Sequence, residues 1–328
     1  MLEQPLLAPA DARPGVRSAA ILGLGHALAG KVVPTRDIAA RLGVEEPWLV
    51  RRTGIRERRH AAPGETLAGL AVRAGRAALA DAGVDAADVD MVLVATVAPD
   101  QILPNAAPVV AHRLGAVRAG GMDVGAACTG FVSALSLATA QVESGRADRV
   151  LVIGAETLSR FLDHDDRRTA GLFADGAGAA VVGPGDAAIG PVVLRQYGEL
   201  AGAIFASHGE QLIRMDGHET FKAAVSSMSS LSLEACAAAG VTLDDIDVVV
   251  LHQANQRILT AVAERLELPE SRLVDVVAGL GNTSAASVPL ALSLARADNR
   301  LRQGDRVLVA AAGAGFTAGA AVLEWGLA

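Results

Sequence analysis

AGVDAADVDMVLV, at residues 82–94, is the stretch that decides the fold, because it returns as AGVTLDDIDVVVL at residues 239–251. The two copies are 157 residues apart, the separation of Gly83 and Gly240. Two further segments repeat at the same offset: ALSLA at 134–138 and 291–295, and DRVLV at 148–152 and 305–309. Three matches at one offset indicate a tandem duplication, in which the second half of the chain repeats the first.

Each half alternates helices and strands. In the first half we expect, in order, a helix over 71–82, a buried strand over 89–94, an apolar strand over 121–124, a helix from Thr129 and a strand over 149–153. The strands are almost continuous runs of Val, Ile and Leu, as in sheets that helices cover on both faces. Two such halves packed face to face predict an α/β fold of five αβαβα layers with shared central helices.

A Gly- and Pro-rich stretch over 183–191 marks the expected boundary between the halves. We expect a loose N-terminal leader over 1–15, an N-terminal half over 16–187 and a C-terminal half over 188–328. The leader lacks the basic and apolar segments of a signal peptide, and no apolar run is long enough to span a bilayer. A cytoplasmic protein without membrane contacts is therefore expected.

Composition narrows the classes of partner. The 328 residues include 29 basic and 36 acidic side chains, for a net charge of −7, and only 3 % are aromatic. Bulk attraction to nucleic acid and stacked aromatic platforms for bases are therefore excluded, and an acidic partner needs a local basic patch. Two cysteines are too few for a disulfide framework, which favours a reducing, cytosolic setting.

The duplication also shows where the halves differ in reactive side chains. At the offset of 157 residues, three reactive residues correspond to small ones: Cys128 to Ala285, His252 to Ala95, and Asn282 to Gly125. All three lie in or beside segments that pseudo-twofold symmetry relates. We therefore expect them to converge on one pocket.

Cys128 follows the expected strand over 121–124 and opens a helix. The dipole and free N–H groups of a helix start stabilise a thiolate, and small neighbours leave the backbone accessible to a substrate carbonyl. A free cysteine is also often only a small buried hydrophobic residue, which suits Cys236, placed mid-helix among alanines. We interpret Cys128 as a nucleophile.

His252 ends an expected strand, at the sheet edge where α/β proteins bind ligands. Asn282 precedes an expected helix, and taken alone it would be interpreted as a plain N-cap. Beside Cys128 and His252, we favour a role as an amide donor to an oxyanion. The acidic run DHDD at 163–166 is flanked by arginines and is typical of a solvated loop, so no metal site is expected.

Five segments carry a family resemblance: WLVRRTGIRER at 48–58, the segment around Cys128, FADGAGA at 173–179, HQANQRI at 252–258 and GNTSAAS at 281–287. In these segments the chain resembles β-ketoacyl-acyl-carrier-protein synthase III (KAS III), a family of condensing enzymes with the thiolase fold. The resemblance covers nearly the whole chain after the leader. It implies a thiolase-like αβαβα fold built from the two duplicated halves.

The resemblance implies a two-step reaction. Cys128 takes an acyl group from acyl-CoA as a thioester, and malonyl-acyl-carrier protein then binds, loses CO₂ and attacks the acyl-enzyme through its carbanion. His252 and Asn282 would donate hydrogen bonds to the enolate oxygen, and the backbone N–H groups of Cys128 and Ala314 would hold the other oxyanion. No cofactor beyond the acyl-CoA substrate is implied.

Further roles come from the resemblance alone. Trp48 matches the residue that stacks on the CoA adenine, with Arg52 and Arg167 as its flanking cations, and Asn255 joins this CoA-binding set. The acyl pocket is assigned to Leu103, Ala312 and Phe316, and Leu103 matches a residue that crosses a homodimer interface into the partner's pocket. Docking of the carrier protein is assigned to Lys222, Arg257 and Arg265.

Three departures from the family pattern predict a wider cavity mouth. Ala312 replaces a usual aromatic residue, the segment 196–214 is shorter than the usual capping region, and His218 stands where the family often has asparagine. We expect a primer or acceptor bulkier than acetyl-CoA, in fatty-acid or polyketide initiation or in other secondary metabolism.

Three alternatives remain open. The first is a KAS III-like acyltransferase that passes the acyl group to an alcohol or amine without condensation; Ala312 favours it, and the retained Cys, His and Asn disfavour it. The second is a Cys-His-Asn hydrolase, because papain-like proteases share that residue order, although the duplicated α/β pattern disfavours it. The third is a non-enzymatic scaffold subunit, which the retained nucleophile disfavours.

Overall fold

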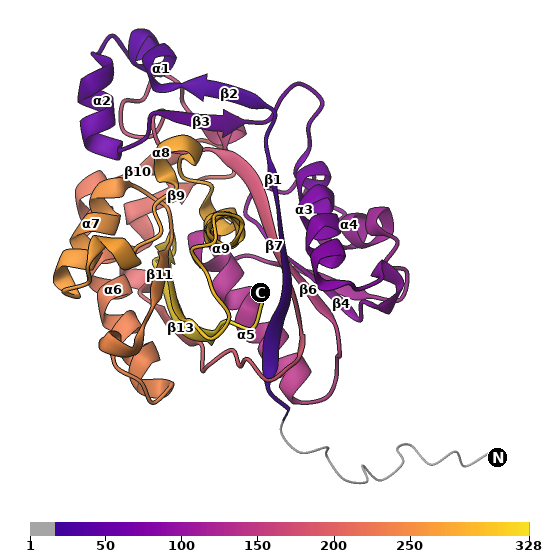
Figure 1. The fold of residues 1–328 in the computed structure, drawn as a ribbon. Coiled ribbons are helices and arrows are strands. Elements are labelled where there is room, and N and C mark those ends of the chain that lie inside the picture. Colours follow the sequence, from indigo (N-terminus) through magenta and orange to yellow (C-terminus); the bar gives the residue numbers. More distant parts are fainter. Residues whose placement is uncertain (1–16, 328) are drawn as a thin grey trace.

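The computed structural model describes residues 17–327, so the expected leader lies outside the described residues. The first half contains β1 (Ala19–Leu28), β2 (Lys31–Pro34), α1 (Thr35–Leu42), α2 (Glu46–Thr53), β3 (Glu57–His60), α3 (Leu67–Ala82), β4 (Met91–Ala95), α4 (Ala106–Leu114), β5 (Gly120–Val124), α5 (Gly130–Glu143), β6 (Val150–Thr157) and β7 (Asp175–Pro184). The second contains β8 (Val193–Gln196), β9 (Ile204–Ala206), β10 (Ile213–Met215), α6 (Gly217–Ala238), β11 (Val248–Leu251), α7 (Gln256–Arg265), α8 (Val277–Leu280), α9 (Ser287–Ala297), β12 (Arg306–Gly313) and β13 (Thr317–Glu324). Figure 1 shows their arrangement.

Two sheets carry the duplication. One has the strand order β1-β7-β6-β4-β5 and the other β8-β13-β12-β11. In the first, β4 and β6 are parallel and β7 runs antiparallel to β6 and β1. In the second, β11 and β12 are parallel and β13 runs antiparallel to β12 and β8. The expected boundary at 187/188 falls in the connection between the two sheets.

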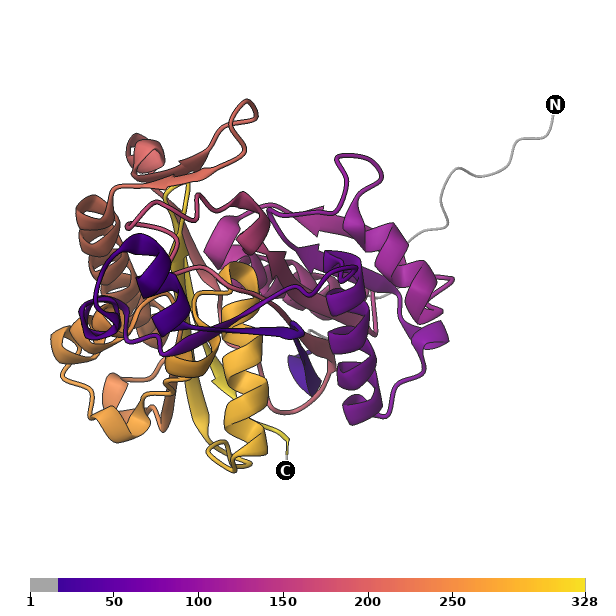
Figure 2. The same ribbon diagram turned by 90° about the horizontal axis from the view of Figure 1, so that it is seen from above.

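Helices α5 and α9 lie between the sheets and contact strands of both (Figures 1 and 2). Their apolar side chains, such as Phe131 and Leu292, pack with Val152 and Val309 from the inner faces of the sheets. Neighbouring strand residues, such as Leu151, point into the outer core. There α3 and α4 cover the first sheet, and α6, with α7 against it, covers the second. This is the predicted thiolase-like αβαβα fold of five layers.

One expected strand differs in its surroundings. The strand predicted over 121–124 is β5, but it is not a buried apolar strand. It pairs with β4 alone at the edge of the sheet, and Met122 is 47 % exposed. The sequence GGMDV gives few apolar side chains to bury, and within residues 17–327 no strand pairs with the second edge of β5.

The most detailed sign of the duplication lies just before the central helices. The helix expected from Thr129 begins at Gly130, after a short 3₁₀ turn over Ala127–Thr129. A matching turn over Ser284–Ala286 precedes α9 at the same offset of 157 residues. Ala127 and Ser284 both adopt left-handed backbone conformations, with φ of +44° and +49°. The duplication therefore repeats even the strained residue of each turn.

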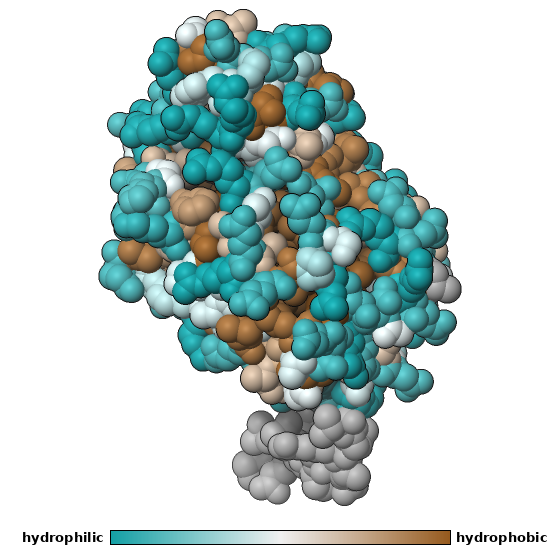
Figure 3. Space-filling model, turned by 60° about the vertical axis from the view of Figure 1, so that its left-hand side comes forward, coloured by the Kyte–Doolittle hydropathy of each residue, from teal (hydrophilic) through white to brown (hydrophobic). Residues whose placement is uncertain are grey.

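The surface is mixed in character. Hydrophilic residues cover most of the face in Figure 3, and a band of hydrophobic residues runs through its middle. Within residues 17–327, no helix is both long and apolar enough to cross a membrane. The same part of the chain has no group of three or more His, Cys, Asp or Glu side chains placed to hold a metal ion.

Candidate active site

A cavity of about 1480 Å³ is lined by residues of both halves, including Cys128, His252 and Asn282. Cys128 lies in the turn before α5, His252 follows β11, and Asn282 precedes the turn before α9. All three are buried, with exposed fractions of 8 %, 1 % and 6 %. The structure thus brings together the three residues that the comparison of the halves singled out. Cys236, by contrast, is buried in the core on α6, as expected.

Cys128 is held against the loop that follows β12. A Cβ atom on Gly313 would lie 2.6 Å from Cys128 Cβ and 2.9 Å from its Sγ, so only glycine fits there. Burial raises the pKa of the thiol, and the backbone N–H groups of Cys128 and Ala314 and the side chain of Ser284 act against that rise. Ala314 follows Gly313 directly and lines the cavity beside Cys128.

The N–H groups beside Cys128 lower the pKa of its thiol, as expected of a helix start, but they do not make it a thiolate at rest. The helix begins where it was predicted, but burial outweighs the hydrogen bonds and raises the pKa of the Cys128 thiol to about 11. The nearby Glu156 carboxyl raises it further by charge repulsion. A thiol removed from water loses the solvation of its charged form, so Cys128 rests as a neutral thiol.

His252 is fixed by the first residue of α9. Its Nδ1 lies 2.6 Å from the Ser287 hydroxyl, which also accepts the N–H of Gln253 at 3.2 Å. When that hydroxyl donates to Nδ1, the imidazole carries its proton on Nε2. Burial lowers the pKa of His252 to about 3, so the ring is neutral at physiological pH. Its side chain can donate a hydrogen bond without carrying charge.

Asn282 is anchored through its backbone and its amide oxygen. Its N–H donates to the Leu172 carbonyl at 3.0 Å, and its carbonyl accepts the Ala174 N–H at 2.8 Å. The side-chain Oδ1 accepts the Ser284 N–H at 2.9 Å. Asn282 is therefore not the N-cap of α9, which is Ala286; its oxygen instead holds the turn before that helix. Within residues 17–327, no hydrogen bond engages its Nδ2 group, and Asn282 lines the cavity.

Sequence reasoning missed Glu156, at the end of β6. Its side chain is fully buried, and Oε1 accepts the Ser284 hydroxyl at 3.1 Å. Oε2 accepts the Thr96 hydroxyl at 3.1 Å and the Val97 N–H at 3.2 Å. Burial raises the pKa of this carboxyl to about 8. The offset that revealed Cys128 also pairs Glu156 with Gly313, and this signal could have found it.

The predicted CoA-binding residues meet at the cavity mouth, where Trp48, Arg52, Arg167 and Asn255 all line the wall. The Arg52 guanidinium stacks 4.4 Å from the centroid of the Trp48 ring. Asn255 has structural partners: its Oδ1 caps α7 by accepting the Arg257 N–H at 2.8 Å, and its Nδ2 donates to the Arg52 carbonyl at 3.0 Å. It therefore fastens α7 to α2 beside the stacked pair.

Comparison with known proteins agrees with this geometry. A family model described as 3-oxoacyl-[acyl-carrier-protein (ACP)] synthase III matches residues 122–198, and its C-terminal counterpart matches residues 236–325. A β-ketoacyl-[acyl-carrier-protein] synthase III of Bradyrhizobium diazoefficiens is 44 % identical over 93 % of this chain and 98 % of that protein. This chain belongs to the KAS III family.

Solved structures extend the comparison. The KAS III of Thermus thermophilus is 42 % identical, with a TM-score of 0.91, over 94 % of this chain and all of that one. The priming β-ketosynthase of the R1128 polyketide biosynthetic pathway is 37 % identical, with a TM-score of 0.93, over 98 % of this chain and all of that one. KAS III enzymes are acyl-transferring condensing enzymes, and this chain is one of them.

The predicted acyl-pocket residues of this KAS III enzyme separate into two groups. Ala312 and Phe316 are buried and line the cavity. Leu103 is 79 % exposed and, among the described residues, is not part of the cavity wall, although its neighbour Ile102 is. The single chain thus leaves Leu103 on the surface, where it can reach another molecule.

The predicted docking residues are also divided. Lys222 and Arg257 line the cavity, and the Arg257 guanidinium lies 5.6 Å from the centroid of the Phe221 ring. Arg265 is exposed at the other end of α7, about 12 Å along the helix from Arg257, and lies outside the cavity wall as described. Arg160 and Arg168 also line the wall, and sequence reasoning missed both.

The segment over 196–214 covers part of the cavity. It forms the hairpin of β9 and β10, whose residues Ile204, Phe205 and Ile213 line the wall. His218, at the start of α6, lines the wall as well. The β9–β10 hairpin therefore covers this side of the cavity mouth. At position 312, by contrast, the wall has only the small side chain of alanine.

Proposed function

We propose that this enzyme takes an acyl group from acyl-CoA onto Cys128 and condenses it with malonyl-acyl-carrier protein, giving a β-ketoacyl product that starts a fatty-acid or polyketide chain. One observation carries the proposal. A neutral histidine and an asparagine, each with its second polar atom already engaged, share the wall of one cavity with a buried thiol. Two neutral donors beside a nucleophile suit enolate chemistry.

In the acylation step, the sulfur of Cys128 attacks the thioester carbonyl and CoA leaves as a thiolate. The carbonyl oxygen becomes an oxyanion, which the backbone N–H groups of Cys128 and Ala314 stabilise. Support comes from the close approach of Gly313 to Cys128, and from these two N–H groups, which lower the pKa of the thiol against the effect of burial. Rigid backbone donors need no reorganisation when the charge develops.

In the condensation step, loss of CO₂ from the malonyl group leaves an enolate, whose carbon attacks the acyl-enzyme. Nε2 of His252 and Nδ2 of Asn282 donate to the enolate oxygen. A charged imidazolium would protonate the enolate carbon and end the reaction. The low pKa of His252 removes that risk, because the ring is neutral over the working range of pH.

At the mouth, the stacked Trp48 and Arg52 bind the adenine, and Arg167 pairs with the CoA phosphates. Six cationic side chains line the cavity: Arg52, Arg160, Arg167, Arg168, Lys222 and Arg257. Asp100 is the one acidic residue in the wall among the residues described. A protein of net charge −7 thus concentrates positive charge where a polyphosphate and an acidic carrier protein approach. Arg265 extends this docking surface along α7.

The active unit is a homodimer in this proposal. The outer edge of β5 has no partner strand within the described chain, and an unpaired edge is a template for another strand. Exposed apolar residues follow β4 and precede or lie on β5: Ile102, Leu103, Val117 and Met122. A second copy pairing through β5 would bury them and bring Leu103 to the partner's acyl pocket. Both cysteines are free thiols, as a cytoplasmic enzyme would keep them.

Mass spectrometry tests the function directly. With acyl-CoA, the intact protein should gain one acyl group on the peptide that contains Cys128, and malonyl-carrier protein should then release CO₂ and a β-keto product. Cys128→Ala should abolish acylation, whereas Cys236→Ala, the matched buried control, should retain it. Acylation of the Cys128→Ala protein would refute the assignment of the nucleophile.

The same experiment addresses the second candidate, a KAS III-like acyltransferase. Ala312 favours it, because a small residue leaves room beside the catalytic groups for an alcohol or amine acceptor. Release of the acyl group to such an acceptor, with no CO₂ from malonyl-carrier protein, would select this alternative over condensation.

A further inference from the structure

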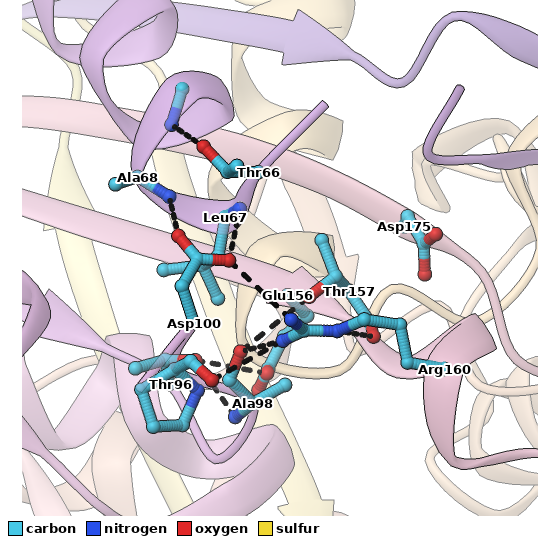
Figure 4. Close-up of polar contacts among 12 residues, drawn as sticks. Thr66, Leu67, Ala68, Thr96, Ala98, Asp100, Glu156, Thr157, Arg160 and Asp175 are labelled. Atoms are coloured by element: carbon cyan, nitrogen blue, oxygen red, sulfur yellow. Dashed lines mark hydrogen bonds and ion pairs between the residues drawn. The ribbon is translucent and has the colours of Figure 1, made fainter. Parts of the chain in front are cut away.

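Glu156 is a carboxyl that the two proposed steps do not use. It lies one residue before the end of β6, is fully buried and, within residues 17–327, forms none of the ion pairs. Its oxygens are held instead by neutral donors from two segments, Thr96 with Val97 and Ser284 (Figure 4 shows the contact with Thr96). Burying a carboxyl without a charged partner costs free energy, so charge pairing does not explain why Glu156 lies here.

Ser284 connects this carboxyl to the nucleophile. Its hydroxyl donates to Glu156 Oε1 at 3.1 Å. The turn that contains Ser284 packs against the turn that contains Cys128, and the Ser284 side chain lowers the pKa of the Cys128 thiol against the effect of burial. Ser284 adopts φ of +49°, a conformation that favours glycine, and it occupies the position of Ala127 in the duplicated turn. The strained turn thus holds a hydroxyl on the carboxyl, in the cavity wall that it shares with Cys128.

We propose that Glu156, acting through the Ser284 hydroxyl, takes up the proton that Cys128 loses on acylation and returns it when condensation frees the sulfur. In this scheme Glu156 does not touch the substrate. It is a positioning residue that acts on Cys128 through Ser284. The inference rests on the acylation of Cys128 in the proposed function. It gives that step the base that the buried thiol lacks.

The proton and electron balance closes over the cycle. On acylation, the S–H proton of Cys128 passes to Ser284 Oγ while the Ser284 proton passes to Glu156, and the sulfur electron pair forms the bond to the acyl carbon. The C–S bond to CoA breaks, and the CoA thiolate takes a proton from water at the cavity mouth. On condensation, the new C–C bond forms, the C–S bond to Cys128 breaks, and the sulfur recovers its proton from Glu156 through Ser284.

The acid strengths of the groups suit this exchange. Burial raises the pKa of Glu156 to about 8 and that of Cys128 to about 11, so the carboxyl titrates first and nearer to neutral pH. A base is most effective when its pKa lies near the working pH. Once Glu156 holds the proton, it no longer repels the thiolate or the later enolate.

Charged groups on neighbouring segments have other partners. Arg160 donates to the Ala98 carbonyl at 2.6 Å and pairs with Asp100 at 3.4 Å (Figure 4). Asp100 also accepts two N–H groups at the start of α3, and Asp175 accepts from Ser159 and Ala61. The Cys128 thiol, by contrast, has its pKa raised by burial and further by the charge of Glu156.

The test measures thiolate formation without any acyl substrate. In a Cys236→Ala background, the rate of Cys128 alkylation by iodoacetamide is followed from pH 6 to pH 10. The wild-type rate should rise through an inflection near pH 8. Glu156→Gln keeps the size and hydrogen-bonding groups but cannot ionise, so the inflection should vanish and the rate at pH 8 should fall about 100-fold. Glu156→Asp should restore the inflection.

Two further variants separate proton transfer from loss of packing. Ser284→Ala breaks the link and should resemble Glu156→Gln, even if one of the two folds poorly. Thr139→Val removes a buried hydroxyl on α5, bonded to the Leu135 carbonyl at 2.9 Å, and should leave the profile unchanged. Alkylation of Glu156→Gln as fast as wild type, or faster, would overturn the proposal. A normal profile with no acylation by any acyl-CoA would refute the proposed function instead.

Discussion

The two short turns before the central helices share one conformation and differ in their side chains. Ala127–Thr129 contains the nucleophile, and its counterpart Ser284–Ala286 has alanine at that position. The strand ends that face these turns show the reverse pattern. β12 brings a glycine, Gly313, to the turn with the nucleophile, and β6 brings a carboxyl, Glu156, to the turn without it. The duplication thus gives two equivalent backbone conformations. The chemistry comes from the four positions at which a reactive residue of one half corresponds to a small residue of the other.

The difference also explains why a glycine faces the sulfur. Gly313 permits the backbone of its loop to lie against Cys128, which brings the Ala314 N–H to the reacting atom. At the equivalent position, a glutamate side chain occupies the space beside the second turn. One half is built for close approach of backbone to sulfur, and the other for storage of a proton.

The largest loss of acylation rate should follow when Gly313 is given a side chain, as its counterpart Glu156 has one. Gly313→Ala places a Cβ atom 2.6 Å from Cys128 Cβ and 2.9 Å from its backbone nitrogen, so the loop must move away. Loss of one oxyanion donor typically costs about 10²–10³-fold in rate, and we expect a loss of that size in acylation. Stopped-flow or quenched acylation assays measure it.

The matched control for that variant is Gly279→Ala, in α8. A Cβ atom there meets nothing within 4 Å, so acylation should remain at the wild-type rate. Equal acylation by the Gly313→Ala and wild-type enzymes would show that the close approach of the loop has no part in the reaction.

A smaller effect should follow from filling the position one residue earlier. Ala312→Phe narrows the cavity beside the catalytic groups and should shift the preference towards short acyl chains. Hydrophobic pockets discriminate by about 1–3 kcal/mol per methylene, so the shift should be graded. Values of kcat/KM for a chain-length series on both proteins test it, and identical profiles peaking at acetyl-CoA would show that Ala312 does not set the specificity.

The smallest expected effect is that of pH on decarboxylation between pH 5 and 8. The folded-state pKa of His252 is lowered to about 3, so its neutral form is already complete in that range and no rate should be lost as the pH falls to 5. Decarboxylation by enzyme that is already acylated isolates this step from the titration of Glu156. A fall through pH 6–7 would mean that the imidazole titrates like an exposed histidine.

Much of this arrangement could be predicted from the sequence, because the two halves still share recognisable stretches of amino-acid sequence. The offset of 157 residues predicted the layers and the two related turns, and its mismatches predicted that Cys128, His252 and Asn282 converge. Glu156 was missed because a single carboxylate in an apolar strand was not compared with its partner, Gly313. The same comparison, extended by one more strand, contains the signal.

Other features depend on burial, which the sequence does not determine. The sequence placed Cys128 correctly at a helix start, but its neutral state follows from the burial of the thiol. Whether the outer edge of β5 is paired depends on which strands lie next to it in the sheet, and the sequence of β5 does not determine this. The separation of Arg265 from Lys222 depends on the direction of α7 relative to the cavity, which residue spacing alone does not give.

The most direct test of the central claim compares the two steps in His252→Ala and Asn282→Ala. Both side chains are assigned to the enolate, so their loss should spare acylation of Cys128 by acyl-CoA while lowering decarboxylation of malonyl-carrier protein about a hundredfold or more. The ratio of the two rates, measured on the same preparation by mass spectrometry and CO₂ release, is the decisive quantity. Variants that decarboxylate normally but fail to acylate would contradict the account and point to a hydrolase-like base.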